Sequence, residues 1–105
     1  MKNIFIISFI LLFHSILFSD EGNGKELFQE YCWGCHHETA QAFGPSFKSI
    51  ANKRSSAEII AQIIDPNSTY KSLGYKINSM PAFNDLNNDE VESLVTYIYK
   101  FKDEK

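Results

Sequence analysis

The chain is poor in cysteine. Only two of its 105 residues are cysteines, and both fall in the stretch Cys32–His37, CWGCHH. Two cysteines allow a single disulfide, and because only two residues separate them, that bridge would constrain the unfolded chain little. A zinc site usually takes a second pair of ligands from a distant segment, but the only other histidine, His14, lies near the N-terminus. No cysteine lies near the predicted cleavage point at the end of the apolar N-terminal run, which excludes a lipid-modified N-terminal cysteine.

Strong positive charge and strand-like patterns are also missing. Ten basic and 13 acidic residues give a formal net charge of −3, and there is no basic stripe of the kind that binds nucleic acid. No segment alternates with the two-residue period of a strand, and the chain has no internal repeat or low-complexity tract. The sequence therefore predicts one all-α domain of three to four helices, with no nucleic-acid partner.

The apolar run at the N-terminus is shorter than an ordinary membrane-spanning helix. It extends from Ile4 to Phe18, whereas a span usually needs about 20 apolar residues. A short positive start before the run, and small Ser19 before a polar stretch, are typical of a secretory signal peptide. We expect residues 1–19 to be a signal peptide or an uncleaved anchor, and residues 20–105 to form one periplasmic domain.

The first half of this domain is expected to carry two helices. Asn23 followed by Glu26 resembles a capping box, so the first helix should start after Asn23 and run into CWGCHH. A loop through residues 40–45 should follow, since Gly and Pro together mark a turn. Residues 47–52 suit one short helix.

Two further capping boxes mark the second half. Ser55 with Glu58 predicts a helix that ends at Asp65, because the residue before a proline is pushed away from helical geometry. Residues 67–83 show no sustained period and read as one long loop, a length that is usually functional or disordered. Asn87–Glu90 should cap the last helix. Its apolar face comprises Val91, Leu94, Val95, Ile98 and Phe101.

The motif Cys32-x-x-Cys35-His36 is a signature of c-type haem attachment. Two thiols three positions apart on one helical turn can form thioethers with the two vinyl groups of one porphyrin. His36 would then bind the iron through an imidazole nitrogen. His37 should point away from the iron, toward solvent or a local hydrogen bond.

Two other chemistries fit the cysteines less well. A zinc site would crowd Cys32, Cys35, His36 and His37 into six residues. A reactive dithiol normally starts a helix after a strand, and no strand is predicted here. A plain structural disulfide remains the simplest alternative to both.

A haem would need a second axial ligand, and the chain contains one methionine besides the initiator. Met80 lies in the long loop and is followed by Pro81. A methionine can simply fill a gap in a core, but one in a polar loop is a poorer core candidate than one on a helix face. A thioether ligand opposite His36 would raise the reduction potential.

These pieces together resemble a small bacterial monohaem class I cytochrome c. The resemblance covers nearly all of the domain: a helix before CWGCH, then Gly44-Pro45, then Met80-Pro81, then a closing amphipathic helix. It implies the class I cytochrome c fold, with three to four helices wrapped around one haem c bound covalently to Cys32 and Cys35.

The resemblance also implies roles for single residues. His36 and Met80 would be the axial iron ligands, and the carbonyl of Pro45 would accept a hydrogen bond from the outer imidazole nitrogen of His36. The first and last helices would cross near Gly24. Weaker candidates are Trp33, for packing near the haem edge, and four residues for binding the propionates: Arg54, Tyr70, Tyr75 and Asn78.

The expected function is one-electron transfer in an extracytoplasmic respiratory chain. The partners would be an oxidase, a peroxidase or a reductase, and a membrane would enter only as the surface of a partner complex or through an uncleaved signal. The protein is expected to be a carrier and not an enzyme, because no nucleophile or acid–base constellation is apparent. The alternatives are a haem-bearing gas sensor, a cytochrome subunit of a larger redox enzyme and, more remotely, a CxxC thiol-redox or zinc-binding protein.

Overall fold

The computed structural model describes residues 21–104. Within them it has six helical elements and no named strand, so the predicted all-α fold is confirmed. Residues 1–19, where we expect a signal peptide or anchor, lie outside the described residues. The elements are α2 (Glu21–Leu27), η2 (Phe28–Cys32), α3 (Phe47–Lys53), α4 (Ser56–Ile64), α5 (Pro66–Thr69) and α6 (Asn88–Tyr99).

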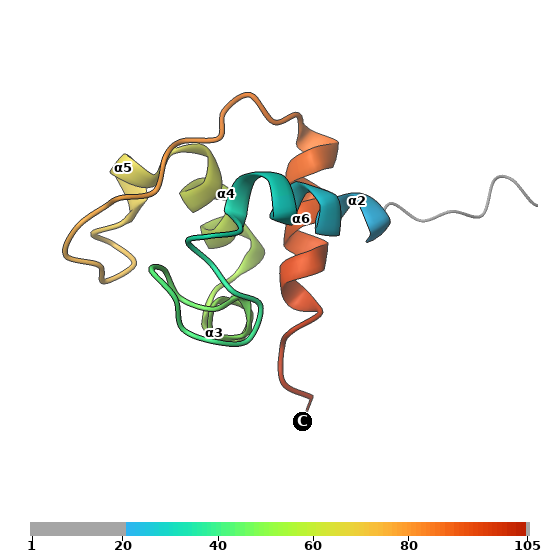
Figure 1. Ribbon diagram of the computed structural model, residues 1–105. Helices are drawn as coiled ribbons and strands as arrows, with labels where there is room; N and C mark the ends of the chain where they lie inside the picture. Colours follow the sequence, from blue (N-terminus) through green and yellow to red (C-terminus); the bar gives the residue numbers. More distant parts are fainter. Residues whose placement is uncertain (1–20, 105) are drawn as a thin grey trace, which may run out of the picture.

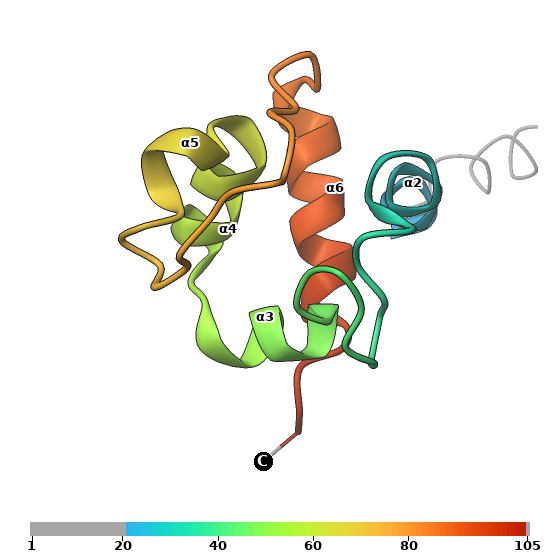
Figure 2. The same ribbon diagram turned by 60° about the vertical axis from the view of Figure 1, so that its left-hand side comes forward.

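The C-terminal helix α6 is the centre of the arrangement. It contacts α2, α3 and α4, and Figure 2 shows it standing between α2 on one side and α4 on the other, with α3 near its C-terminal end. The long segment between α5 and α6 passes over α4 on its way to the start of α6 (Figure 1). Three of the other helices therefore pack directly on one amphipathic helix.

The crossing of α2 and α6 at Gly24 is confirmed. A Cβ atom at Gly24 would lie 2.3 Å from the carbonyl oxygen of Ser93 and 2.8 Å from Cβ of Tyr97. Real carbon atoms do not approach so closely, so only glycine allows the two helices to touch at this point.

The predicted start of the first helix is wrong. Asn23 lies inside α2, which already includes Glu21, and so it does not cap the helix. The helix does run into the motif as expected, but its last five residues, Phe28–Cys32, are wound as a π-helix. Such wider turns are rare and frequently occur at functional sites.

The other capping predictions are confirmed. Ser55 and Glu58 form a capping box at α4, as Asn87 and Glu90 do at α6, and each box has both reciprocal hydrogen bonds. Helix α4 ends at Ile64, directly before Asp65.

The expected loop over residues 67–83 is only partly right. Pro66 begins the short helix α5, because a proline at the first helical position has no N–H that the helix would need. The expectation treated Pro66 as a terminator alone.

One hydrophobic core joins all the longer helices. Its buried members come from α2, η2, α3, α4 and α6: Leu27, Phe28, Phe47, Ala51, Ile59, Ile63, Leu94, Val95, Tyr97 and Ile98. The predicted apolar face of α6 is buried except for Phe101, which lies beyond the helix and is half-buried. None of the helices in residues 21–104 has the length and apolar character needed to cross a membrane.

Candidate cofactor site

The two cysteines lie on either side of the point where the first helix ends. Cys32 is the last residue of η2, and Cys35 lies in the turn that follows. The expectation that both share one helical turn is therefore wrong. Gly34, between them, has φ of 102°, a conformation that favours glycine, and the backbone N–H of His36 donates to the carbonyl of Cys32 at 3.1 Å.

The two thiols are free and differ in exposure. Cys35 is exposed, whereas Cys32 is half-buried and packs against the core. Burial, with a smaller contribution from Cys35, raises the pKa of the Cys32 thiol to about 11. Reactive cysteines of redox proteins have a lowered pKa, so this environment argues against a thiol-redox site.

His36 is held in place by the loop that follows the motif. Its Nδ1 atom lies 2.7 Å from the carbonyl oxygen of Pro45. A carbonyl can only accept, so Nδ1 carries the proton and Nε2 keeps its lone pair. Among the described residues Nε2 has no hydrogen-bond partner, and the nitrogen that is free to bind a metal is thereby defined.

Gly44 fits against the same imidazole ring. A Cβ atom at this position would lie 2.6 Å from Cε1 and 2.9 Å from Nδ1 of His36. The backbone N–H of Gly44 also donates to the carbonyl of Cys35 at 2.6 Å. The loop therefore packs its backbone directly on the ring, and the absence of a side chain at Gly44 is a requirement of the site.

His37 has a local role, as expected. It is exposed, and its Nδ1 accepts the backbone N–H groups of Thr39 and Ala40 at 3.1 and 3.0 Å. The histidine therefore caps the turn after the motif. In residues 21–104 no three Cys, His, Asp or Glu side chains come together in a group that would hold a metal ion, so the zinc hypothesis gains no support.

The start of α3 ties the motif to the rest of the fold. Backbone N–H groups at the start of this helix have no partner within it, and those of Phe47 and Lys48 donate to the carbonyls of His37 and Glu38, both at 2.9 Å. Ser46 caps the helix through its side chain. The residues that follow His36 are thus bonded to a helix whose Phe47 belongs to the core.

Helix α6 fixes the same loop from the other side. The hydroxyl of Tyr97 donates to Oε2 of Glu38 at 2.6 Å. Burial, and then the Glu38 carboxylate, raise the pKa of Tyr97 to about 12, so the phenol stays protonated at physiological pH and can act as this donor.

Met80 lies on an irregular segment that is nevertheless held firmly. The side chain of Asn78 binds both backbone groups of Met80: its Oδ1 accepts the Met80 N–H at 3.0 Å, and its Nδ2 donates to the Met80 carbonyl at 3.1 Å. Three residues beyond Met80, the N–H of Phe83 donates to the carbonyl of Ile63 in α4 at 2.9 Å. Asn78 also donates to Oδ1 of Asn67 at 2.9 Å.

Three of the four main candidates border the same core. Cys32 and Met80 pack against it, and the ring of His36 lies 5.7 Å from that of Phe47, measured between centroids. Met80 is half-buried, as is His36. Two residues stand apart, because Cys35 is exposed and Trp33 leaves 69% of its surface in solvent.

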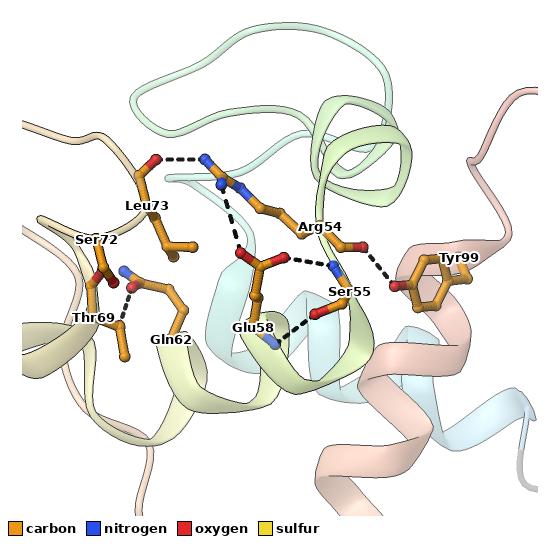
Figure 3. A network of polar contacts seen from close by, with 8 residues as sticks. All are labelled: Arg54, Ser55, Glu58, Gln62, Thr69, Ser72, Leu73 and Tyr99. Carbon is orange, nitrogen blue, oxygen red and sulfur yellow. Dashed lines mark hydrogen bonds and ion pairs between the residues drawn. The ribbon is translucent and has the colours of Figure 1, made fainter.

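Three of the four weak candidates for propionate binding are linked to one another, and the fourth is not part of that group. Arg54 donates through its guanidinium to the carbonyl of Leu73 at 2.6 Å and lies 3.9 Å from Glu58 (Figure 3). Its guanidinium also covers the ring of Tyr75. Arg54 and Tyr75 thus lie together, and the backbone N–H of Tyr75 donates to the carbonyl of Tyr70 at 3.0 Å. Asn78 binds the backbone of Met80 instead. Tyr70 contacts Lys71 through its ring.

Two residues of the site were missed by the sequence analysis. Gly44 was read only as part of a turn, and nothing in the sequence places it against the His36 ring. Gln62 donates from Nε2 to Sδ of Met80 at 3.8 Å. Its signal was present, because Gln62 is the one polar residue in the run Ile59–Ile64 and is half-buried there.

Comparison with known proteins places the chain in a family. A family model described as Cytochrome C oxidase, cbb3-type, subunit III matches residues 19–98. The chain belongs to this family. The cbb3-type subunit III domain carries a covalently bound c-type haem that transfers electrons, so haem c is the cofactor of this chain. A comparison with curated proteins finds no match.

The residues of the structure fit such a cofactor. They offer two free thiols two residues apart, an imidazole whose Nε2 has no partner in the described part of the chain, and a half-buried thioether on the same core. Thioether bonds, imidazole ligation and thioether ligation are the three ways in which c-type haem is usually held.

Proposed function

We propose that the chain is a one-electron carrier in an extracytoplasmic respiratory chain, with haem c attached to Cys32 and Cys35 and ligated by His36 and Met80. The haem would supply an iron that alternates between the ferric and ferrous states. The observation that carries this proposal is the hydrogen bond from Nδ1 of His36 to Pro45, since it leaves Nε2 as the ligating atom.

The protein's contribution is to hold two ligands and keep water away. Pro45 and Gly44 fix the orientation of the His36 ring, and a carbonyl partner increases the basicity of the ligating nitrogen. The side chain of Asn78 hydrogen-bonds both backbone groups of Met80, so the segment that carries the thioether is held in place. Both axial positions would then be filled, which suits electron transfer better than the binding of a gas.

A second candidate function is a haem subunit of a larger redox complex. The family description favours it, since it names a subunit of a cbb3-type cytochrome c oxidase. The site residues would have the same roles in this case. The difference lies in the partner, which would be a fixed neighbour in the complex and not a transient one. Co-purification of the full-length chain with an oxidase from its native membranes distinguishes the two.

Substitution of Met80 tests the proposed ligation. We expect Met80→Ala to retain the covalent haem, to have a lower reduction potential and to bind carbon monoxide in the reduced state. The native reduced protein should not bind it. The thioether favours the ferrous state, so its loss should lower the potential.

Redox titration and difference spectra with carbon monoxide provide the measurement. The matched control is Ile77→Ala. Ile77 is an exposed apolar residue of the same segment, so this substitution should leave both the reduction potential and the carbon monoxide binding unchanged. An unchanged potential in Met80→Ala would remove Met80 from the site.

A further inference from the structure

A polar relay from α5 through α4 ends on the sulfur of Met80. The hydroxyl of Thr69, at the end of α5, donates to Oε1 of Gln62 in α4 (Figure 3). The other end of the same amide group, Nε2, donates to Sδ of Met80 at 3.8 Å. Thr69 and Gln62 are both half-buried, so water competes weakly for these contacts.

The chemistry of the sulfur decides which way the amide points. A thioether sulfur can only accept, so it pairs favourably with the N–H₂ end of Gln62 and not with its carbonyl end. The Thr69 hydroxyl has a single proton. Its shorter contact is with Gln62, whereas the carbonyl of Asp65 lies 3.3 Å away. Donor and acceptor directions thus run consistently from Thr69 to Met80.

We propose that Gln62 is a positioning residue that raises the reduction potential by donating a hydrogen bond to the Met80 sulfur. This inference rests on the proposed ligation of iron by Met80. A hydrogen bond withdraws electron density from the sulfur and so weakens its donation to ferric iron more than to ferrous iron. The reduced state gains relative to the oxidised state, and Thr69 holds the amide in the orientation that produces this effect.

The size of the effect follows from ordinary hydrogen-bond energies. Only the difference in this hydrogen bond between the oxidised and reduced states changes the redox equilibrium constant, and for one ordinary hydrogen bond we expect a change of roughly two- to tenfold at most. A tenfold change in a one-electron couple is 59 mV. The relay should therefore alter the potential by up to about 59 mV, which redox titration resolves easily.

Two variants of the full-length holoprotein test the relay. Gln62→Leu removes the hydrogen-bond donor while keeping a side chain of similar length. We expect its reduction potential to fall by the amount that corresponds to a roughly two- to tenfold change in the redox equilibrium constant. Thr69→Val leaves Gln62 in place but frees its orientation, so a smaller fall of the same sign is expected. Gln29→Leu, at an exposed position of η2, makes the same chemical change away from Met80 and should leave the potential as in the native protein.

The absorption spectrum provides a second measurement. It should not change if Gln62 has only a structural role. The ferric protein should show a sulfur-to-iron charge-transfer band, and in Gln62→Leu this band should remain but change its wavelength. A potential and band equal to those of Gln29→Leu would overturn the role of Gln62 while leaving Met80 as the ligand. Absence of the band in the native ferric protein, with an unchanged potential in Met80→Ala, would overturn both proposals.

Discussion

At the scale of single residues, the site depends on backbone groups that approach one imidazole ring. The Pro45 carbonyl accepts a hydrogen bond from Nδ1 of His36, and Gly44 lies so close to the ring that a Cβ atom there would be 2.6 Å from Cε1. The ring cannot move away from Gly44 without losing its hydrogen bond to Pro45. The position of Nε2, the proposed ligating nitrogen, is therefore set by two neighbouring residues with different functions.

This arrangement predicts a steric cost at Gly44. In Gly44→Ala the new methyl group would lie 2.6 Å from the ring, although its backbone conformation does not itself require glycine. Overpacking of this kind typically costs about 1–3 kcal/mol in the free energy of unfolding. Urea denaturation of the holoprotein measures it.

The control is Ala42→Val, which enlarges an exposed side chain of the same loop and should leave stability nearly unchanged. Equal stability of Gly44→Ala and the native protein would mean that the loop relaxes and that the contact with His36 is not required.

At the scale of elements, α2 packs on α6 at a crossing that lies about two helical turns before the motif. Gly24 contacts Ser93 and Tyr97 of α6, and Cys32 follows two turns later. Tyr97 connects this crossing to the loop after the motif through Glu38. The position of the cysteines is thus coupled to the packing of two helices.

Two opposing effects are expected in Gly24→Ala. Alanine has the better helix propensity by about 1 kcal/mol, which alone would stabilise α2. The added Cβ would lie 2.3 Å from a backbone carbonyl oxygen that belongs to another helix and cannot rotate away. We expect the steric cost, at about 1–3 kcal/mol, to win, so that the midpoint of urea denaturation falls.

Asn23→Ala is the matched control for this prediction. Asn23 is an exposed residue of the same helix, so its substitution gains propensity without any steric cost, and its midpoint should rise slightly. A rise in both variants would show that α2 and α6 can separate freely.

At the scale of the whole molecule, the chain is small for an independent fold. A domain of this length buries a limited core and is often completed by a cofactor. Here the half-buried Cys32 and Met80 lie far apart in the sequence and pack against the same core. A haem bound through both would join the first and last thirds of the chain and so would be expected to stabilise a short chain.

The intact mass of the protein purified from its native host under denaturing conditions tests this whole-molecule view. We expect the mass of residues from about Asp20 onward plus one haem, because thioether bonds survive denaturation. A mass that includes residues 1–19 and haem would retain the cytochrome but indicate an uncleaved anchor. A mass without haem would contradict covalent attachment.

The sequence by itself determined the helical class, the positions of two capping boxes and the residues most suited to hold a cofactor. These are local properties, since a cap depends on residues three apart and CWGCH on five consecutive residues. The local sequence patterns predicted the wrong structure at two positions. Asn23 is not a cap because the helix already includes Glu21, and the turn containing Cys35 is not helical.

Only the tertiary structure decided which distant residues touch. The contact of Gly44 with His36, the hydrogen bond of Tyr97 to Glu38 and that of Gln62 to Met80 join residues between 8 and 59 positions apart. No pattern along the chain specifies such pairs, because they form only when α2, α4 and α6 have packed around one core. The candidate cofactor residues could therefore be proposed from the sequence, whereas the groups that orient them could not.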